Sequence, residues 1–174
     1  LYMKKRDVYY RCSNLLPQGI TTTIPDKFFL VAGHSEGITP LNAFDSALID
    51  AGIGNTNLMK MSSILPPNSK KIQPIKLPLG SLVPLAYASK ISSVTGEIIS
   101  AGVACAVPMD KNKNGLIMEY SAPGQKQEIE KIVRHMAEVG MKNRGYKIKT
   151  IYSISTQHPV KKIGAVFAAV VLWW

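Results

Sequence analysis

The chain has 174 residues, of which 46% are hydrophobic and 18% are charged, and its formal net charge is +10. This composition is typical of one soluble globular domain with a real hydrophobic core, and eleven prolines and thirteen glycines argue against a long helical bundle. The basic residues stand in small groups, without a stripe of interleaved basic and aromatic residues. We therefore expect a solvated basic surface, with an anionic partner such as nucleic acid as the alternative.

Cysteine content and the N-terminal segment bear on the compartment. Cys12 and Cys105 have neither metal-ligand spacing nor the pattern of a disulfide framework, so a reducing cytoplasm is expected. Residues 1–26 are basic at the start but lack the apolar segment of a signal peptide, and we expect them to form a flexible arm. The remaining residues, 27–174, are expected to form the domain.

The first half of the domain begins with a predicted strand at residues 27–32, followed by a predicted loop, G-H-S-E-G, at 33–37. Thr39 is a good N-cap residue and Pro40 suits the first helical position. Gly52 can adopt the left-handed conformation that ends many helices. These three signals predict a helix over residues 39–52.

The second half of the domain is rich in predicted strands. A further helix is predicted over residues 125–144, where apolar residues recur at helical spacing and Gly145 follows the end. Strands are predicted at 57–61, 79–92, 97–107, 115–120, 147–155 and 163–172. Because strands dominate and the two helices flank them, we predict a single α+β domain, an αββα-type sandwich of mostly antiparallel strands.

Asp45 is the first of two isolated carboxylates. On a helical wheel it falls inside the apolar stripe defined by Leu41, Phe44 and Leu48. Burial of an unpaired charge is costly, so this carboxylate must be paired, hydrogen-bonded or facing a cavity. Two interpretations stay open: Asp45 caps a loop or pairs with a lysine, or it receives a cationic group of a ligand.

Glu119 is the second isolated carboxylate. It follows Leu116, Ile117 and Met118 in the predicted strand G-L-I-M-E-Y, whose two faces are otherwise apolar. Burial would raise the pKa of this carboxyl and keep it protonated, as a general acid near neutral pH requires. The alternative is that the strand ends here and that Glu119 is solvated.

The remaining candidate motifs predict no further chemistry. His34, His135 and His158 are far apart in the sequence and lack ligand spacing, so no metal site is expected. The glycines of A-G-I-G-N-T-N at residues 51–57 are not followed by the G-K-[ST] of a phosphate-binding loop. The stretch G-H-S-E-G at residues 33–37 has the G-x-S-x-G spacing, but no nucleophile elbow is predicted there.

Four stretches carry a family resemblance: A-G-H-S-E-G-I-T-P-L-N-A-F-D-S-A-L-I-D-A-G-I-G-N-T-N-L-M-K-M-S-S-I-L-P-P, K-L-P-L-G-S-L-V-P, G-L-I-M-E-Y and A-V-F-A-A-V-V-L-W. Together they closely resemble the pyruvoyl-dependent arginine decarboxylases, over roughly residues 28–173. The most specific features are the Ser-Ser pair before I-L-P-P and the two isolated carboxylates.

The resemblance implies that the chain cleaves itself between Ser62 and Ser63. In that family the second hydroxyl attacks the preceding carbonyl, and elimination and hydrolysis convert this serine into a pyruvoyl group. Ser63 would then be the precursor of a covalent cofactor, and the products would be chains 1–62 and 63–174. Asn57 matches an asparagine that assists self-processing in the family.

The implied reaction is decarboxylation of L-arginine to agmatine and CO₂ through a Schiff base to the pyruvoyl group, without pyridoxal phosphate or a metal. Glu119 matches the proton donor of the family, and Asp45 matches the carboxylate that receives the guanidinium group. Family members assemble as trimers or dimers of trimers, so a homo-oligomer is implied here.

One departure from the family pattern and two alternative functions accompany this resemblance. His34 stands where the family pattern leads us to expect a serine. A local contact near the site that is expected from the family is therefore in question. A pyruvoyl enzyme that acts on another amino acid is one alternative. The other is a basic binding module that does not process itself and binds nucleic acid in a salt-dependent manner.

Overall fold

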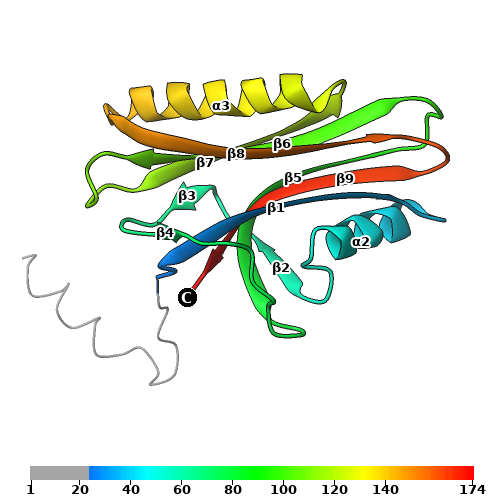
Figure 1. Cartoon of the computed structure of the whole chain (residues 1–174), viewed down its shortest axis with the longest axis horizontal. Helices are drawn as coiled ribbons and strands as arrows, with labels where there is room; N and C mark the ends of the chain where they lie inside the picture. The colour runs from blue at the N-terminus through cyan, green and yellow to red at the C-terminus, as the bar shows by residue number, and fades with distance from the viewer. Residues whose placement is uncertain (1–23) are drawn as a thin grey trace, which may run out of the picture.

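Two sheets lie face to face in the computed structural model, which describes residues 24–174, and a helix covers the outer face of each sheet (Figure 1). The strand orders are β2-β5-β9-β1-β4 in the first sheet and β3-β7-β6-β8 in the second. Neighbouring strands are antiparallel except in the β1–β4 and β2–β5 pairs. The predicted αββα sandwich in a single domain is therefore confirmed. Most of the predicted N-terminal arm, residues 1–23, lies outside the described residues.

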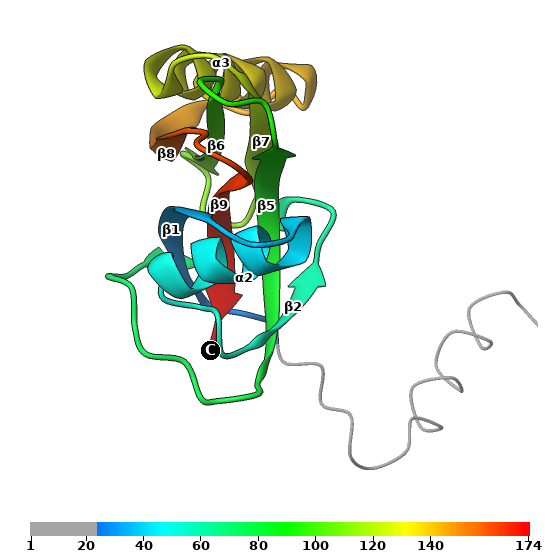
Figure 2. The ribbon, with the colours of Figure 1, turned by 90° about the vertical axis from the view of Figure 1, so that its right-hand side faces the viewer.

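The elements follow the predicted order closely, with differences of a few residues at most ends. Figure 2 shows β1, β9, β5 and β2 side by side in the first sheet and β8, β6 and β7 in the second. The elements are β1 (Lys27–Glu36), α2 (Pro40–Asp50), β2 (Asn57–Lys60), β3 (Ile64–Leu65), β4 (Lys70–Lys71), β5 (Leu82–Ser92), β6 (Ile98–Pro108), β7 (Gly115–Pro123), α3 (Lys126–Asn143), β8 (Ile148–Pro159) and β9 (Gly164–Trp173).

The loop predicted at residues 33–37 is largely wrong. Residues 33–36 continue β1, because β9 pairs with the whole of this strand as far as Glu36 opposite Gly164. Turn-forming residue types suggested a loop, but the long antiparallel partner supplies ladder hydrogen bonds that override that local preference. The two-residue strands β3 and β4 were not predicted, since two residues show no periodicity.

The predicted ends of α2 are confirmed, and its predicted buried face is right for Leu48 and for the partly buried Phe44 but wrong for Leu41. The side chain of Thr39 accepts a hydrogen bond from the Asn42 N–H at 3.2 Å. The helix buries Ala43, Ala47 and Leu48, whereas Leu41 is 75% exposed. A Cβ atom on Gly33 would lie 2.3 Å from the Ala47 carbonyl oxygen, so this glycine lets the alanine face approach the sheet closely.

The hydrophobic core has three layers. The largest lies between the two sheets, and the other two lie between each sheet and its helix. The thiol of Cys105 is free and fully buried in the central layer, where burial raises its pKa to about 12. Helix α3 buries Ile129 and Val133, whereas Val139 of the same helix is 42% exposed. Neither of the described helices combines the length and the hydropathy needed to cross a membrane.

Candidate functional site

The chain crosses from the first sheet to the second at Ser62 and Ser63. The Met61 N–H donates a hydrogen bond to the Leu85 carbonyl of β5 at 2.9 Å. Two residues later, the Ser63 carbonyl accepts one from the Ile117 N–H of β7 at 2.8 Å. The Ser62 side chain is exposed and forms no hydrogen bond to another residue of the described range. Backbone hydrogen bonds to different sheets therefore flank the peptide bond between the two serines.

Ser63 has an unusual backbone conformation. Its φ angle is +67°, in the left-handed region that residues other than glycine rarely adopt. This conformation costs an L-residue with a Cβ atom about 1 kcal/mol or more. The residue directly precedes β3, so the strained position is also the point where the chain turns to join β7.

The hydroxyl group of Ser63 donates a shared hydrogen bond to both carboxylate oxygens of Glu119, at 2.9 and 3.0 Å. Glu119 lies on β7 opposite Val103 of β6 and is half-buried. Burial raises the pKa of Glu119, and the hydrogen bond from Ser63 and the charge of Lys60 oppose that rise. Of the two interpretations of Glu119, the structure agrees with the partly buried carboxyl that has a raised pKa. Among residues 24–174, the Ser63 hydroxyl is the only group that donates a hydrogen bond to this carboxylate.

Lys60 is a member of this site that sequence reasoning missed. Its Nζ atom lies 4.6 Å from the centroid of the Tyr87 ring on β5, which holds the ammonium group by a cation–π contact. A signal was present in the sequence, since Lys60 precedes Ser63 by three residues in the same segment. The structure adds Lys60 as the positive charge that acts on Glu119.

Asp45 lies on the exposed face of α2, so its predicted place in the buried stripe is wrong. Ile38, Leu41 and Ile49 on or beside this helix are 87%, 75% and 58% exposed. The Asp45 carboxylate forms no hydrogen bond or ion pair with any other residue in the range 24–174. Neither the loop cap nor the lysine pair is found there, and Asp45 makes no such contact with Ser63 within one protomer.

Asn57 begins β2 on the same segment as the two serines. Its side-chain amide donates to the Gly80 carbonyl at 2.8 Å, and its backbone N–H donates to the Ser81 carbonyl at the same distance. In the described part of the chain it forms no hydrogen bond to Ser62 or Ser63. Asn57 thus anchors β2 to the loop before β5, and its role in self-processing stays a prediction.

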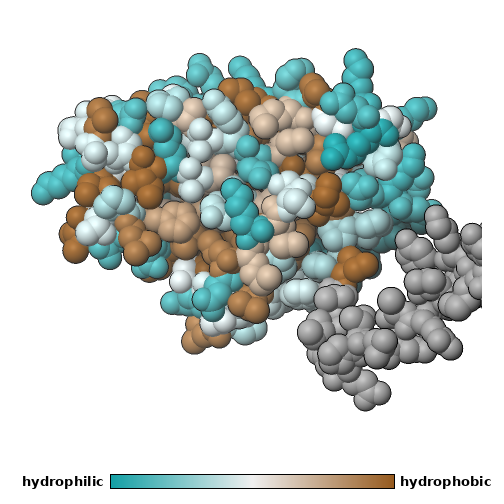
Figure 3. Space-filling model, turned by 180° about the vertical axis from the view of Figure 1, so that it is seen from behind, coloured by the Kyte–Doolittle hydropathy of each residue, from teal (hydrophilic) through white to brown (hydrophobic). Residues whose placement is uncertain are grey.

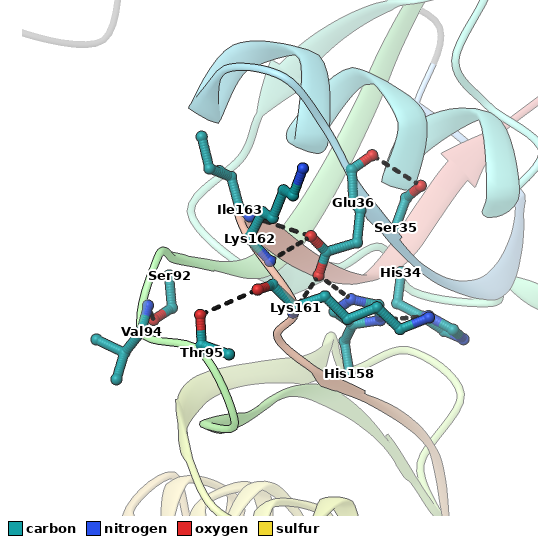
Figure 4. A network of polar contacts seen from close by, with 10 residues as sticks. All are labelled: His34, Ser35, Glu36, Ser92, Val94, Thr95, His158, Lys161, Lys162 and Ile163. Atoms are coloured by element: carbon teal, nitrogen blue, oxygen red, sulfur yellow. Dashed lines mark hydrogen bonds and ion pairs between the residues drawn. The ribbon is translucent and has the colours of Figure 1, made fainter.

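A second polar cluster lies at the end of β1, around Glu36 (Figure 4). The Glu36 carboxylate accepts hydrogen bonds from the backbone N–H of Lys161 at 2.8 Å, of Lys162 at 2.9 Å and of Ile163 at 3.0 Å. His158 Nε2 lies 2.7 Å from the same carboxylate. Led by the bond from Lys161, these contacts outweigh burial and lower the pKa of Glu36 to about 2.

The two histidines near Glu36 come together only in the folded chain. His34 Nδ1 lies 3.0 Å from His158 Nδ1, so a residue that departs from the family pattern belongs to the Glu36 cluster. Within residues 24–174 no three His, Cys, Asp or Glu side chains are arranged to hold a metal ion.

Comparison with known proteins shows similarity to one family over most of the chain. The family model described as pyruvoyl-dependent arginine decarboxylase matches residues 27–173. A protein of that name from Methanocaldococcus jannaschii is 52% identical over 151 residues, which cover 87% of this chain and 92% of the relative. One from Methanococcus aeolicus is 48% identical over 92% of this chain and 98% of the relative. One from Pyrococcus abyssi is 43% identical over 87% and 97%, respectively.

Proposed function

Because the chain belongs to the pyruvoyl-dependent arginine decarboxylase family, we propose that it converts L-arginine to agmatine and CO₂ with a pyruvoyl group formed from its own Ser63. The observation that carries this proposal is the hydrogen bond from the Ser63 hydroxyl to both oxygens of Glu119, at a strained position. We also place the enzyme in the cytoplasm, in keeping with its free buried cysteine.

The residues present suit the formation of such a group. A pyruvoyl group must stand at the N-terminus of a new chain, and Ser63 is followed at once by β3, which pairs with β7. The preceding residue, Ser62, is small and exposed, so departure of its carboxylate meets no packed side chain. The position is strained before cleavage, and breaking the peptide bond relieves that strain.

Self-processing begins when Ser63 Oγ attacks the carbonyl carbon of Ser62 and Glu119 accepts the hydroxyl proton. The peptide C–N bond breaks and the amide becomes an ester. Loss of the Ser63 α-proton and cleavage of its Cβ–Oγ bond release Ser62 as a carboxylate and leave a dehydroalanine. Addition of water with loss of ammonia then produces the pyruvoyl group at the start of chain 63–174.

In the decarboxylation step, the pyruvoyl group supplies a ketone that binds the substrate amine and withdraws the electrons left by departing CO₂. Glu119 returns a proton to the α-carbon. Burial raises the pKa of this carboxyl, so it retains a proton closer to neutral pH than a solvated glutamate does. Neither pyridoxal phosphate nor a metal ion takes part in this proposal.

We propose that Asp45 of one protomer binds the guanidinium group of the substrate at Ser63 of the neighbouring protomer. Planar bidentate pairing with a carboxylate favours arginine over a simple ammonium. Asp45 sits among exposed apolar residues on α2, and a second exposed apolar set lies close in the sequence to Ser63 or to its hydrogen-bond partner Glu119. Figure 3 shows that apolar side chains are exposed on the face of the molecule opposite to that of Figure 1. That second set consists of Met59, Met61, Ile64 and Tyr120.

Packing of the α2 face of one protomer against the Ser63 face of the next would bury both apolar sets and complete the site. A contact between two different faces closes into a ring when the rotation permits. A homotrimer or a dimer of trimers satisfies this condition, and a twofold contact of α2 with α2 does not bring Asp45 to Ser63.

The first test is the intact mass of the purified protein together with a product assay. We expect two chains that meet between Ser62 and Ser63, with the C-terminal one lighter by one ammonia than a serine-ended peptide. Arginine should yield agmatine, and lysine and ornithine should be poor substrates. A stable full-length mass without agmatine production would favour the alternative of a basic binding module. Preferred turnover of another amino acid would favour a pyruvoyl enzyme with a different substrate.

The second test addresses the shared site. Ser63→Ala cannot form the cofactor, and Asp45→Ala lacks the guanidinium receptor, so each variant alone should be inactive on arginine. When the two variants are co-expressed, part of the activity should return. In some of the contacts of a mixed oligomer, the intact Ser63 of an Asp45→Ala protomer meets the intact Asp45 of a Ser63→Ala protomer. Absence of any recovery in verified mixed oligomers would refute the placement of Asp45 across the interface.

A further inference from the structure

A cavity of about 430 Å³ is lined by residues of β1, β4 and β8 and of the turn between β6 and β7. Figure 1 shows these elements at one end of the sandwich. Neither Ser63, Glu119 nor Asp45 lines the cavity, so it is separate from the site proposed above. Five lysines line this cavity, which we term the lysine cavity: Lys70, Lys71, Lys111, Lys113 and Lys149.

These ammonium groups lack compensating carboxylates. No aspartate or glutamate lines the cavity, and within residues 24–174 none of the five lysines forms an ion pair or a side-chain hydrogen bond. Two acids lie near these lysines, Asp110 beside Lys111 in the sequence and Asp26, whose backbone carbonyl accepts a hydrogen bond from the Lys70 N–H at 2.8 Å. Both carboxylates are engaged elsewhere, Asp26 with Lys27 at 3.1 Å and Asp110 with the Asn112 N–H at 3.0 Å. Like charges around a concavity repel one another and focus a positive potential, so an anion would be attracted there.

The floor of the lysine cavity is apolar and aromatic. Phe28 and Tyr152 have ring centroids 6.0 Å apart, and Leu65 and Val107 lie beside them. The Nζ atom of Lys71 lies 5.3 Å from the centroid of the Tyr152 ring, so charge and ring face the same space. A ligand that suits this lining combines a multiply charged anionic part with a planar, weakly polar part.

We propose that the lysine cavity binds a nucleoside polyphosphate, with the phosphates among the lysines and the base against the aromatic floor. Its volume of about 430 Å³ falls within the range of roughly 300–1,000 Å³ typical of small-molecule sites. The charges surround one concavity and do not follow a stripe of alternating basic and aromatic residues, which favours a small ligand over a nucleic-acid strand. This inference is independent of the decarboxylase proposal.

Titration calorimetry on the purified wild-type oligomer at low ionic strength without Mg²⁺ tests this proposal. ATP should bind with one site per protomer, inorganic tripolyphosphate should bind more weakly, and adenosine should not bind measurably. The triple variant Lys71→Gln, Lys111→Gln, Lys149→Gln should weaken ATP binding at least about tenfold, because three charge-assisted phosphate contacts are lost together.

The matched control variant removes three exposed positive charges elsewhere. Lys126→Gln, Lys131→Gln, Lys162→Gln has the same change in net charge, and its ATP affinity should stay within about twofold of wild type. Self-cleavage and arginine turnover report that each variant is folded. If the triple cavity variant does not fold, the single variant Lys149→Gln should still show a measurable loss.

A change in the floor separates the base from the phosphates. Tyr152→Leu should lower ATP affinity towards that of tripolyphosphate and leave tripolyphosphate binding unchanged. The proposal is overturned if ATP shows no saturable binding, or if the control variant loses as much affinity as the cavity variant. It is equally overturned if a single-stranded oligonucleotide binds more tightly than ATP and displaces it, since the lysines would then serve a polymer.

Discussion

Glu36 and Glu119 are both partly buried strand carboxylates, but their surroundings have opposite effects on their acidity. Glu36 accepts three backbone N–H bonds and contacts His158, and its pKa is lowered to about 2. Glu119 accepts one side-chain hydroxyl, from Ser63, and burial raises its pKa. The number of fixed donors decides the difference, because backbone donors stabilise a permanent negative charge and a single hydroxyl does not.

This difference agrees with the proposal that Glu36 serves the structure and that Glu119 serves the reaction. Glu36 ties the turn between β8 and β9 to the end of β1, and its donors belong to the backbone and cannot leave. The donor to Glu119 is a hydroxyl group that can be consumed by chemistry. A carboxyl with a raised pKa beside a strained serine is better suited to exchange protons in the proposed reaction than Glu36, whose pKa is lowered.

Loss of the hydroxyl of Ser63 should have the largest effect. Ser63→Ala removes the nucleophile and the donor to Glu119, so the chain should stay in one piece without detectable decarboxylation. An intact-mass spectrum under denaturing conditions checks this. A Ser63→Ala protein that still splits after residue 62 would contradict the proposed self-processing.

Removing the titratable group of Glu119 should come next. Glu119→Gln keeps the size of the side chain but cannot transfer a proton, so self-cleavage should be slower and kcat of the cleaved protein on arginine should fall by about 10² to 10⁴. The matched control is Glu36→Gln, whose kcat should stay near wild type below its melting temperature. Equal losses of kcat in both variants would remove the distinction between a reactive and a structural carboxylate.

For Glu36, the expected change is in stability. Glu36→Gln removes the charged acceptor of three backbone N–H groups, of which that of Ile163 is partly buried and the other two are exposed, so the free energy of unfolding should fall by about 1 kcal/mol in denaturant titrations at neutral pH. The pKa of Glu36 is lowered from 4.5 to about 2, so its contribution is present above the unfolded value and is lost as the pH falls through this window. The difference between wild type and Glu36→Gln should therefore shrink below pH 4.5, and a constant difference would contradict the assignment.

The smallest expected effect is on the stability contributed by Glu119. Because its pKa is raised by folding, ionisation of this carboxyl opposes folding, and stability falls as the pH rises through the unfolded value. At neutral pH the free energy of unfolding of Glu119→Gln should therefore equal that of wild type or exceed it by about 0.5 kcal/mol. A clear loss of stability in this variant would indicate that Glu119 serves the fold.

Local signals in the sequence were sufficient for most of the elements. Thr39 and Gly52 marked the ends of α2, and alternating apolar residues marked the long strands, because capping and periodicity depend on near neighbours. These local signals failed where a segment far away in the sequence determined the local structure. Residues 33–36 became strand through β9, and α2 turned its alanine face to the sheet because Gly33 allows a close approach.

By itself, the sequence determined which groups the proposed chemistry uses: the Ser62–Ser63 pair, Glu119 and Asp45, whose residue types do not depend on the fold. Only the tertiary structure decided their relations. It set the Ser63 hydroxyl on Glu119, placed Asp45 on an exposed apolar face and gathered five lysines around one cavity. The physical reason is that contacts between residues far apart in the chain depend on sheet pairing and layer packing, which no short segment encodes.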